Sequence, residues 1–120
     1  MKKQQTGRTG EDAACRALRT RGYRIIERNY RCRYGEIDII ATRSGCLVFV
    51  EVRSKTGTAF GAPAESVTSA KKQRLMAAAM SYLESHTKLP ENWRVDFVGV
   101  DIDPAGTRPP AIEIIEDALG

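Results

Sequence analysis

Two short apolar runs, at residues 37–41 and 47–52, stand on either side of a polar turn that contains Ser44 and Gly45. β-Branched residues dominate both runs, and a Ser-Gly pair between two such runs is typical of a β-hairpin. We therefore expect two antiparallel strands here, and we take this hairpin as the stretch around which the rest of the chain is organised.

Acidic residues interrupt this apolar pattern. Successive side chains of a strand point to opposite faces, so Glu51 and Arg53 share one face of the second run. Asp38 projects from the same side if the two runs pack through their other faces. Those apolar faces would hold Ile37, Ile39, Val48, Val50 and Val52. The pattern then predicts two carboxylates and one cation that meet on neighbouring strands.

A strand with one wet face also carries charges, without any chemical role. Here, however, the charged face also contains Ile40, Leu47 and Phe49, which favours a half-buried surface. A carboxylate held in such a surface requires a partner, which can be a cation, a metal ion or hydrogen-bond donors.

The remaining pattern predicts two helices and three more strands. The first helix begins near Thr9, its N-cap, and ends at Gly22, after a segment 1–6 that we expect to be disordered. A strand at 23–29 near a sheet edge follows it. After the hairpin come a Gly/Pro-containing loop, which we interpret as a substrate-facing flap, and a second helix at 66–85. The last strands are residues 93–102 and 111–115.

This order predicts one α/β domain over residues 1–120, with a mixed central sheet flanked by helices. The long helix between the strand at 47–52 and the strand at 93–102 is typical of a right-handed parallel crossover. The hairpin half of the sheet would be antiparallel.

Composition excludes several classes. No apolar run approaches the length needed to span a membrane, and the basic start lacks the apolar stretch of a secretory signal. Three cysteines without metal-ligand spacing indicate reduced thiols in a cytoplasmic protein. His86 is the only histidine, which disfavours a His/Cys metal site or a Ser-His-Asp triad.

The charge is unevenly distributed. Residues 1–34 hold ten Lys/Arg against three Asp/Glu, whereas residues 35–120 hold nine against twelve. A basic N-terminal third suits a polyanionic ligand, although solubility alone also explains it. Two basic groups are candidates to bind nucleic acid, and they are Arg28, Arg31 and Arg33 in the first third and Lys71, Lys72 and Arg74, which cluster in the second helix.

Each group has a second interpretation. Tyr30 and Tyr34 alternate with the first group and could stack on bases, or they could pack under a loop. The second group lies in the first half of its helix, where cations oppose the helix dipole. Binding to phosphates or to a site carboxylate would explain that position, and so would a solvated helix face.

Together these residues resemble a known family. The chain is similar to the YraN family of small bacterial proteins, which resembles archaeal Holliday junction resolvases and the restriction-endonuclease-like superfamily, whose core motif is PD-(D/E)xK. The resemblance covers nearly the whole chain. It is carried by GxxGE-x-A at 7–13, NYR at 29–31, GEID at 35–38, VEVR at 50–53, SVT-x-x-K at 66–71 and RVDFV at 94–98.

The resemblance implies a restriction-endonuclease-like core and a role for each matched residue. Asp38 and Glu51 would bind Mg²⁺ or Mn²⁺, with Glu11 approaching from the first helix. The residue two positions after Glu51 would be the catalytic lysine, but here it is Arg53. Arginine stays protonated and cannot accept a proton from water, although it can hold a phosphate. Lys55 or Lys71 could take the place of that lysine.

The function implied is metal-dependent hydrolysis of phosphodiester bonds in structured or branched DNA. A resolvase of this kind would act as a homodimer, because a four-way junction has two cut sites. A second possibility is a non-catalytic nucleic-acid-binding module, in which Asp38 and Glu51 neutralise Arg53. A third is a protein-interaction adaptor that does not bind DNA.

Overall fold

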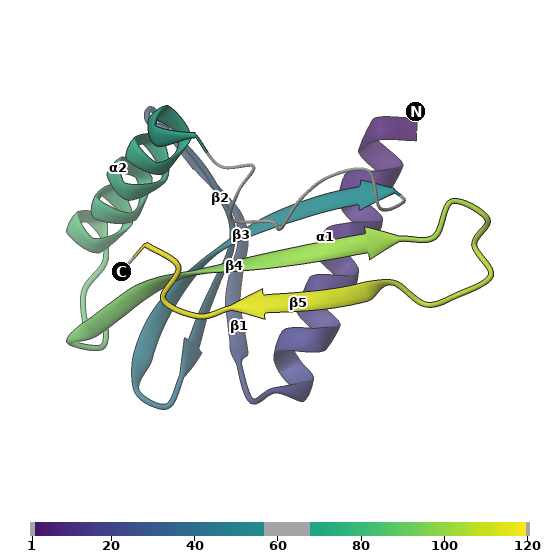
Figure 1. Ribbon diagram of the computed structural model, residues 1–120. Coiled ribbons are helices and arrows are strands. Elements are labelled where there is room, and N and C mark those ends of the chain that lie inside the picture. The colour runs from purple at the N-terminus through teal and green to yellow at the C-terminus, as the bar shows by residue number, and fades with distance from the viewer. Residues whose placement is uncertain (1, 57–67, 120) are drawn as a thin grey trace.

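The computed structural model describes residues 2–56 and 68–119 (Figure 1). Two helices and five strands follow one another along the chain. They are α1 (Lys2–Thr20), β1 (Arg24–Cys32), β2 (Gly35–Arg43), β3 (Cys46–Thr56), α2 (Ser69–Ser85), β4 (Asn92–Ile102) and β5 (Ala111–Ile115). None of the helices in these two described stretches is both long and apolar enough to cross a membrane.

The five strands form one mixed sheet in the order β1-β2-β3-β4-β5. β3 and β4 run parallel, and every other neighbouring pair is antiparallel. The parallel pair is joined through α2, as the sequence predicts, so the predicted α/β architecture is confirmed and is compatible with a restriction-endonuclease-like fold. The flap proposed for the loop after β3, and the first residues of the predicted second helix, fall outside the described residues.

Each face of the sheet packs against one helix, and Figure 1 shows the two helices well apart on either side of the strands. The alternation of strand side chains separates two apolar clusters. The cluster under α1 contains Ala14 and Leu18 of the helix with Ile39, Val48, Val50, Val98 and Val100 of the sheet. The cluster under α2 contains Leu75, Ala78, Ala79 and Tyr82 of the helix with Ile40, Leu47, Phe49, Val95 and Phe97 of the sheet.

The first helix begins at Lys2, which differs from the predicted start near Thr9. Residues 2–6 are helical, so the expectation of a disordered segment there is wrong for them. The physical reason is local, because Lys, Gln and Arg are good helix formers and no proline stands in this stretch. The predicted end of the helix is confirmed, since Gly22 follows it with a φ of 90°.

The hairpin turn has the conformation that its two residues favour. Ser44 and Gly45 both have positive φ angles, 50° and 77°, and Arg43 pairs directly with Cys46 across the turn. A two-residue loop with both central residues in the left-handed region matches the right-handed twist of the flanking strands. The turn therefore sets the register that places Asp38 and Glu51 on adjacent strands.

Gly10 allows α1 to lie very close to the end of β3. A Cβ atom at this position would be 1.7 Å from the Ser54 Oγ and 2.9 Å from the Ser54 Cβ. Any larger residue would have to push the helix away from the strand. This close approach places Glu11, the next residue, beside the part of the sheet that carries Asp38.

Candidate active site

β2 and β3 stop pairing immediately before the two acidic residues. Their register ends at Ile39 opposite Val50, although β3 continues to Thr56. Beyond this point the Asp38 carboxylate replaces the missing backbone acceptor, because its Oδ2 accepts a hydrogen bond of 2.8 Å from the Val52 N–H. The divergence of the strands therefore brings the Asp38 side chain against the backbone of β3.

The same divergence corrects one detail of the predicted faces. Ile39 packs with Val48 and Val50 on the α1 side as predicted, but Ile37 packs in the α2 cluster. Simple alternation would place both isoleucines on one face. It is broken at Asp38, close to Asn29 of β1, whose φ of 55° shows that β1 is also irregular there. The prediction for Ile37 is therefore wrong.

Glu51 lies on the α2 side of β3 and is only 6% exposed. Its Oε1 is 2.8 Å from the Nζ of Lys71, in the first turn of α2. Thr68 caps this helix and accepts a hydrogen bond from the Lys71 backbone N–H, which fixes the start of α2 beside the strand. A cation in the first turn opposes the helix dipole, and the buried carboxylate of Glu51 explains its position.

The two carboxylates affect one another. Burial, and after it the negative charge of Glu51, raises the pKa of Asp38 from an ordinary value of 3.8 to about 7. The hydrogen bond from Val52 acts in the opposite direction, and the charge of Glu11 adds a smaller increase to the pKa. The site therefore holds more negative charge than its surroundings stabilise, which is the condition that a bound cation would relieve.

Glu11 faces this pair from α1 but is held by other partners. Its Oε1 accepts a hydrogen bond of 2.9 Å from the Arg28 Nε and another of 3.1 Å from the Asn29 side chain. Arg28 also contacts Asp12 at 2.8 Å, and its pKa is raised, first by the bond to Asp12 and also by the bond to Glu11. Arg28 therefore links β1 to α1 through two ion pairs. From the sequence, Arg28 is predicted only as a phosphate contact.

The expected group of three acids around one ion is not formed within residues 2–56 and 68–119, where no three His, Cys, Asp or Glu side chains are placed to share a metal. The Asp38–Glu51 pair remains as the donor set. Two oxygen-bearing side chains suit Mg²⁺ or Mn²⁺, because Mg²⁺ retains several waters and needs few protein ligands. The residues of the pair thus fit a hard divalent cation, whereas Glu11 is directed to Arg28.

Arg53 and Lys55 follow Glu51 on β3 at alternate positions, and both are partly buried and engaged in interactions. Lys72 and Arg74 are exposed on α2 near Lys71, and of this second basic group it is Lys71 that contacts the carboxylate pair.

The first basic group is less uniform. Arg31 pairs with Glu36 at 3.5 Å, and Arg33 lies 4.9 Å from the centre of the Tyr34 ring. Tyr30 packs edge-on against Tyr82 with a separation of 5.1 Å between ring centres. Tyr30 therefore packs inside the protein, against α2 rather than under a loop, and stacking on bases stays a prediction.

The raised pKa of Asp38 predicts a characteristic pH dependence of stability in buffer containing EDTA. The folded state binds the Asp38 proton more tightly than the unfolded state, so its contribution is present below about pH 4 and is lost as the pH rises toward 7. We expect Asp38→Asn to remove this contribution while its side-chain oxygen still accepts the Val52 bond. Chemical denaturation at pH 5 and pH 8 should show wild type losing more unfolding free energy than the variant. Equal losses would contradict the assignment.

Known proteins are similar to this chain over most of its length, including the segment that holds the candidate site. A family model described as uncharacterised protein family UPF0102 matches residues 10–100, which include the carboxylate pair and its lysine. A UPF0102 protein of Dehalococcoides mccartyi is 44% identical over 118 residues, covering 98% of this chain and 95% of the relative. One of Clavibacter michiganensis is 41% identical over 117 residues, covering 98% of each chain. The chain therefore belongs to the uncharacterised protein family UPF0102, the YraN family.

Proposed function

We propose that this protein is a metal-dependent nuclease that hydrolyses phosphodiester bonds in structured or branched DNA. The observation that carries the proposal is that the Asp38 and Glu51 carboxylates interact through their charges where β2 and β3 diverge, with Lys71 in the first turn of α2 bound to Glu51. Burial and mutual repulsion leave Asp38 with a raised pKa, which favours the uptake of a cation at this point.

In the proposed site Asp38 and Glu51 would hold Mg²⁺ or Mn²⁺. When bound, such an ion activates a water molecule and neutralises charge on the scissile phosphate. Asp38 is positioned for this role by the Val52 N–H, and Glu51 by its burial in β3.

Lys71 would take the role of the lysine that Arg53 replaces. Its ammonium group is 2.8 Å from Glu51 and its side chain is one third exposed, so it could contact both the carboxylate and a phosphate from solvent. Lys72 and Arg74 extend the same positive charge along the exposed face of α2. A DNA backbone that reaches Glu51 would therefore meet three basic side chains of one helix.

The proposal is tested by incubating four-way junction, duplex and single-stranded DNA with the protein in Mg²⁺, Mn²⁺ or EDTA. We expect cleavage in the presence of metal, none in EDTA, and none with Glu51→Ala in any buffer. No cleavage of any of the three substrates by wild type, or equal cleavage by the variant, would reject the proposal. Sedimentation of the active form would test the expected homodimer.

A non-catalytic nucleic-acid-binding module is the second candidate, and the Lys71–Glu51 ion pair favours it. In this case the pair already neutralises Glu51, and DNA contacts only the exposed basic residues. Binding would then depend on salt, be unaffected by EDTA and be retained by Glu51→Ala.

A further inference from the structure

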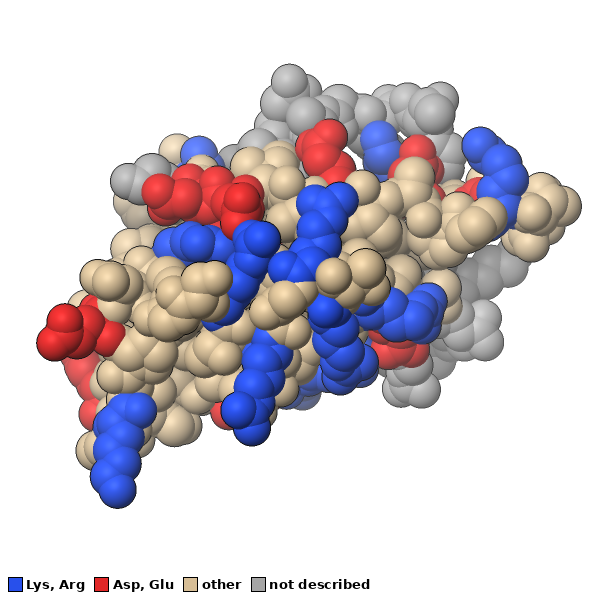
Figure 2. Space-filling model, turned by 90° about the horizontal axis from the view of Figure 1, so that it is seen from below, with Lys and Arg blue, Asp and Glu red and all other residues tan. Residues whose placement is uncertain are grey.

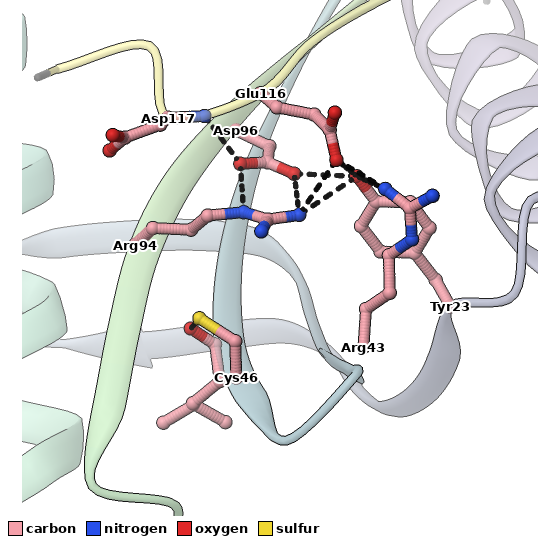
Figure 3. A network of polar contacts seen from close by, with 8 residues as sticks. Tyr23, Arg43, Cys46, Arg94, Asp96, Glu116 and Asp117 are labelled. Carbon is pink, nitrogen blue, oxygen red and sulfur yellow. Dashed lines mark hydrogen bonds and ion pairs between the residues drawn. The ribbon is translucent and has the colours of Figure 1, made fainter.

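A second polar cluster lies at the other end of the sheet, where α1 leads into β1 and β2 turns into β3 (Figure 3). Asp96 of β4 accepts hydrogen bonds from the Tyr23 hydroxyl at 2.7 Å and from the Arg94 Nε at 2.9 Å. Arg94 also donates to the Oε1 of Glu116 at 3.0 Å, and Arg43 pairs with the same oxygen. Two guanidinium groups therefore share one carboxylate oxygen.

Asp96 and Tyr23 hold the two arginines in place. Asp96 is fully buried, and it also accepts a bond of 2.9 Å from the Asp117 N–H. Arg43 lies over the ring of Tyr23, with 4.8 Å between its guanidinium carbon and the ring centre. Guanidinium groups that are fixed before a ligand arrives lose little conformational freedom on binding, which favours tight contacts with a planar or tetrahedral anion.

Positive charge surrounds this cluster. Figure 2 shows Lys and Arg side chains gathered across the middle of the face that contains this end of the molecule. Arg19, Arg21 and Arg24 are exposed around the connection between α1 and β1. With Arg43 and Arg94 they make five arginines, against the three acidic residues Asp96, Glu116 and Asp117. These eight residues are therefore net positive as a group.

Strand β2 connects the cluster to the carboxylate pair, because it carries both Arg43 and Asp38. Arg43 lies five residues beyond Asp38 on the same strand, a separation of roughly 16 Å along the strand. A ligand bound at Arg43 and Arg94 would thus contact the protein well away from Glu51. The carboxylate pair and the two arginines would then contact different parts of the ligand, as expected for an extended or branched polyanion.

Glu116 differs from the other members of the cluster because it is about half exposed, at 51% of its side chain. It follows the last strand, and its carboxylate pairs with the two arginines and accepts from the Tyr23 hydroxyl. A phosphate offers more acceptor oxygens to two guanidinium groups than one shared carboxylate oxygen does.

We propose that Arg43 and Arg94 form a second phosphate-binding site for the backbone of a nucleic acid, and that the Glu116 carboxylate occupies this site when nucleic acid is absent. The proposal rests on the proposed function for the choice of nucleic acid as the ligand, and it assigns a second segment or arm of the DNA to this end of the molecule. Arg19, Arg21 and Arg24 would continue the contact along the backbone.

The test is fluorescence anisotropy with the full chain in EDTA, using a labelled duplex and a labelled four-way junction over a range of salt concentrations. Glu116→Gln should tighten binding about 3- to 10-fold, because it removes the competing charge from the two arginines. Glu113→Gln on β5 is the matched control, since it makes the same charge change at an exposed position. It should alter affinity by less than about 2-fold.

Arg43→Gln should weaken binding and reduce the slope of log affinity against log salt by about one. The exposed Arg21→Gln provides a second variant whose folding is not at risk, and it should weaken binding in the same direction. Thermal melts of each variant establish that the fold is retained.

Equal affinities for Glu116→Gln and Glu113→Gln, together with an unchanged salt slope in folded Arg43→Gln and Arg21→Gln, would overturn the proposal and leave a purely structural cluster. Equally tight binding of labelled polyglutamate would also overturn it, since an acidic protein would then fit as well. Absence of cleavage with these binding effects intact would reject the nuclease proposal alone.

Discussion

Replacing Asp96 by alanine is expected to lower the free energy of unfolding by about 3–5 kcal/mol. The Asp96 carboxylate is fully buried and accepts bonds from Arg94, from the Tyr23 hydroxyl and from the Asp117 N–H. Without it, the Asp117 N–H loses its acceptor, and Arg94 and the Tyr23 hydroxyl keep only the half-exposed Glu116. The loss is large because the donors around a fully buried carboxylate are left incompletely paired.

Urea denaturation followed by circular dichroism measures this effect. Glu113→Ala is the control, because Glu113 is exposed on the edge strand β5 and should cost less than about 1 kcal/mol. A loss below about 1 kcal/mol for Asp96→Ala as well would show that the cluster does not stabilise the fold.

The second large effect is expected for Lys71→Met, which should reduce the rate of metal-dependent cleavage by about 10²- to 10³-fold. The variant keeps the length and apolar stem of the side chain but removes the cation beside Glu51. If Lys71 stabilises charge on the phosphate in the transition state, the loss should appear in kcat rather than in KM.

Lys72→Met is the matched control, because Lys72 is the exposed neighbour in the same turn of α2. It should weaken DNA binding and its salt dependence with little effect on kcat. Equal effects of the two variants on kcat would show that Lys71 contributes only general positive charge. Lys71→Arg should restore part of the rate, because a cation returns to the same position.

Local patterns were sufficient to predict the architecture. The β-branched runs and the Ser44-Gly45 turn indicated the hairpin, and the long helix before β4 indicated the parallel crossover. The same alternation predicts that Glu51 shares a face with Phe49, and the structure shows that α2 covers this face. These features depend on neighbours in sequence, so a single chain is enough to predict them.

Other features depend on contacts between distant segments. The break in alternation at Asp38 accompanies the left-handed conformation of Asn29, and asparagine, which tolerates positive φ, was the only local signal for it. The Lys71–Glu51 pair joins a helix to a strand 20 residues earlier, although the unfavourable position of the lysine hinted at a carboxylate partner.

The Asp96 cluster had no local signal of any kind. Its members come from the residue before β1, from β2 and β4, and from the segment after β5, and Tyr23 and Glu116 are 93 residues apart. Within the pattern of β4, Asp96 is simply a polar residue in an alternating strand. Only the folded chain shows that it is the centre of a buried network.

Titration of Mn²⁺ into the metal-free protein by calorimetry, with wild type and Glu51→Gln compared at the same pH, tests most directly whether the carboxylate pair is a metal site. We predict one saturable site in wild type and binding at least about 10-fold weaker in the variant. No saturable binding in wild type, or the same affinity in both proteins, would contradict the assignment of Asp38 and Glu51 as metal ligands.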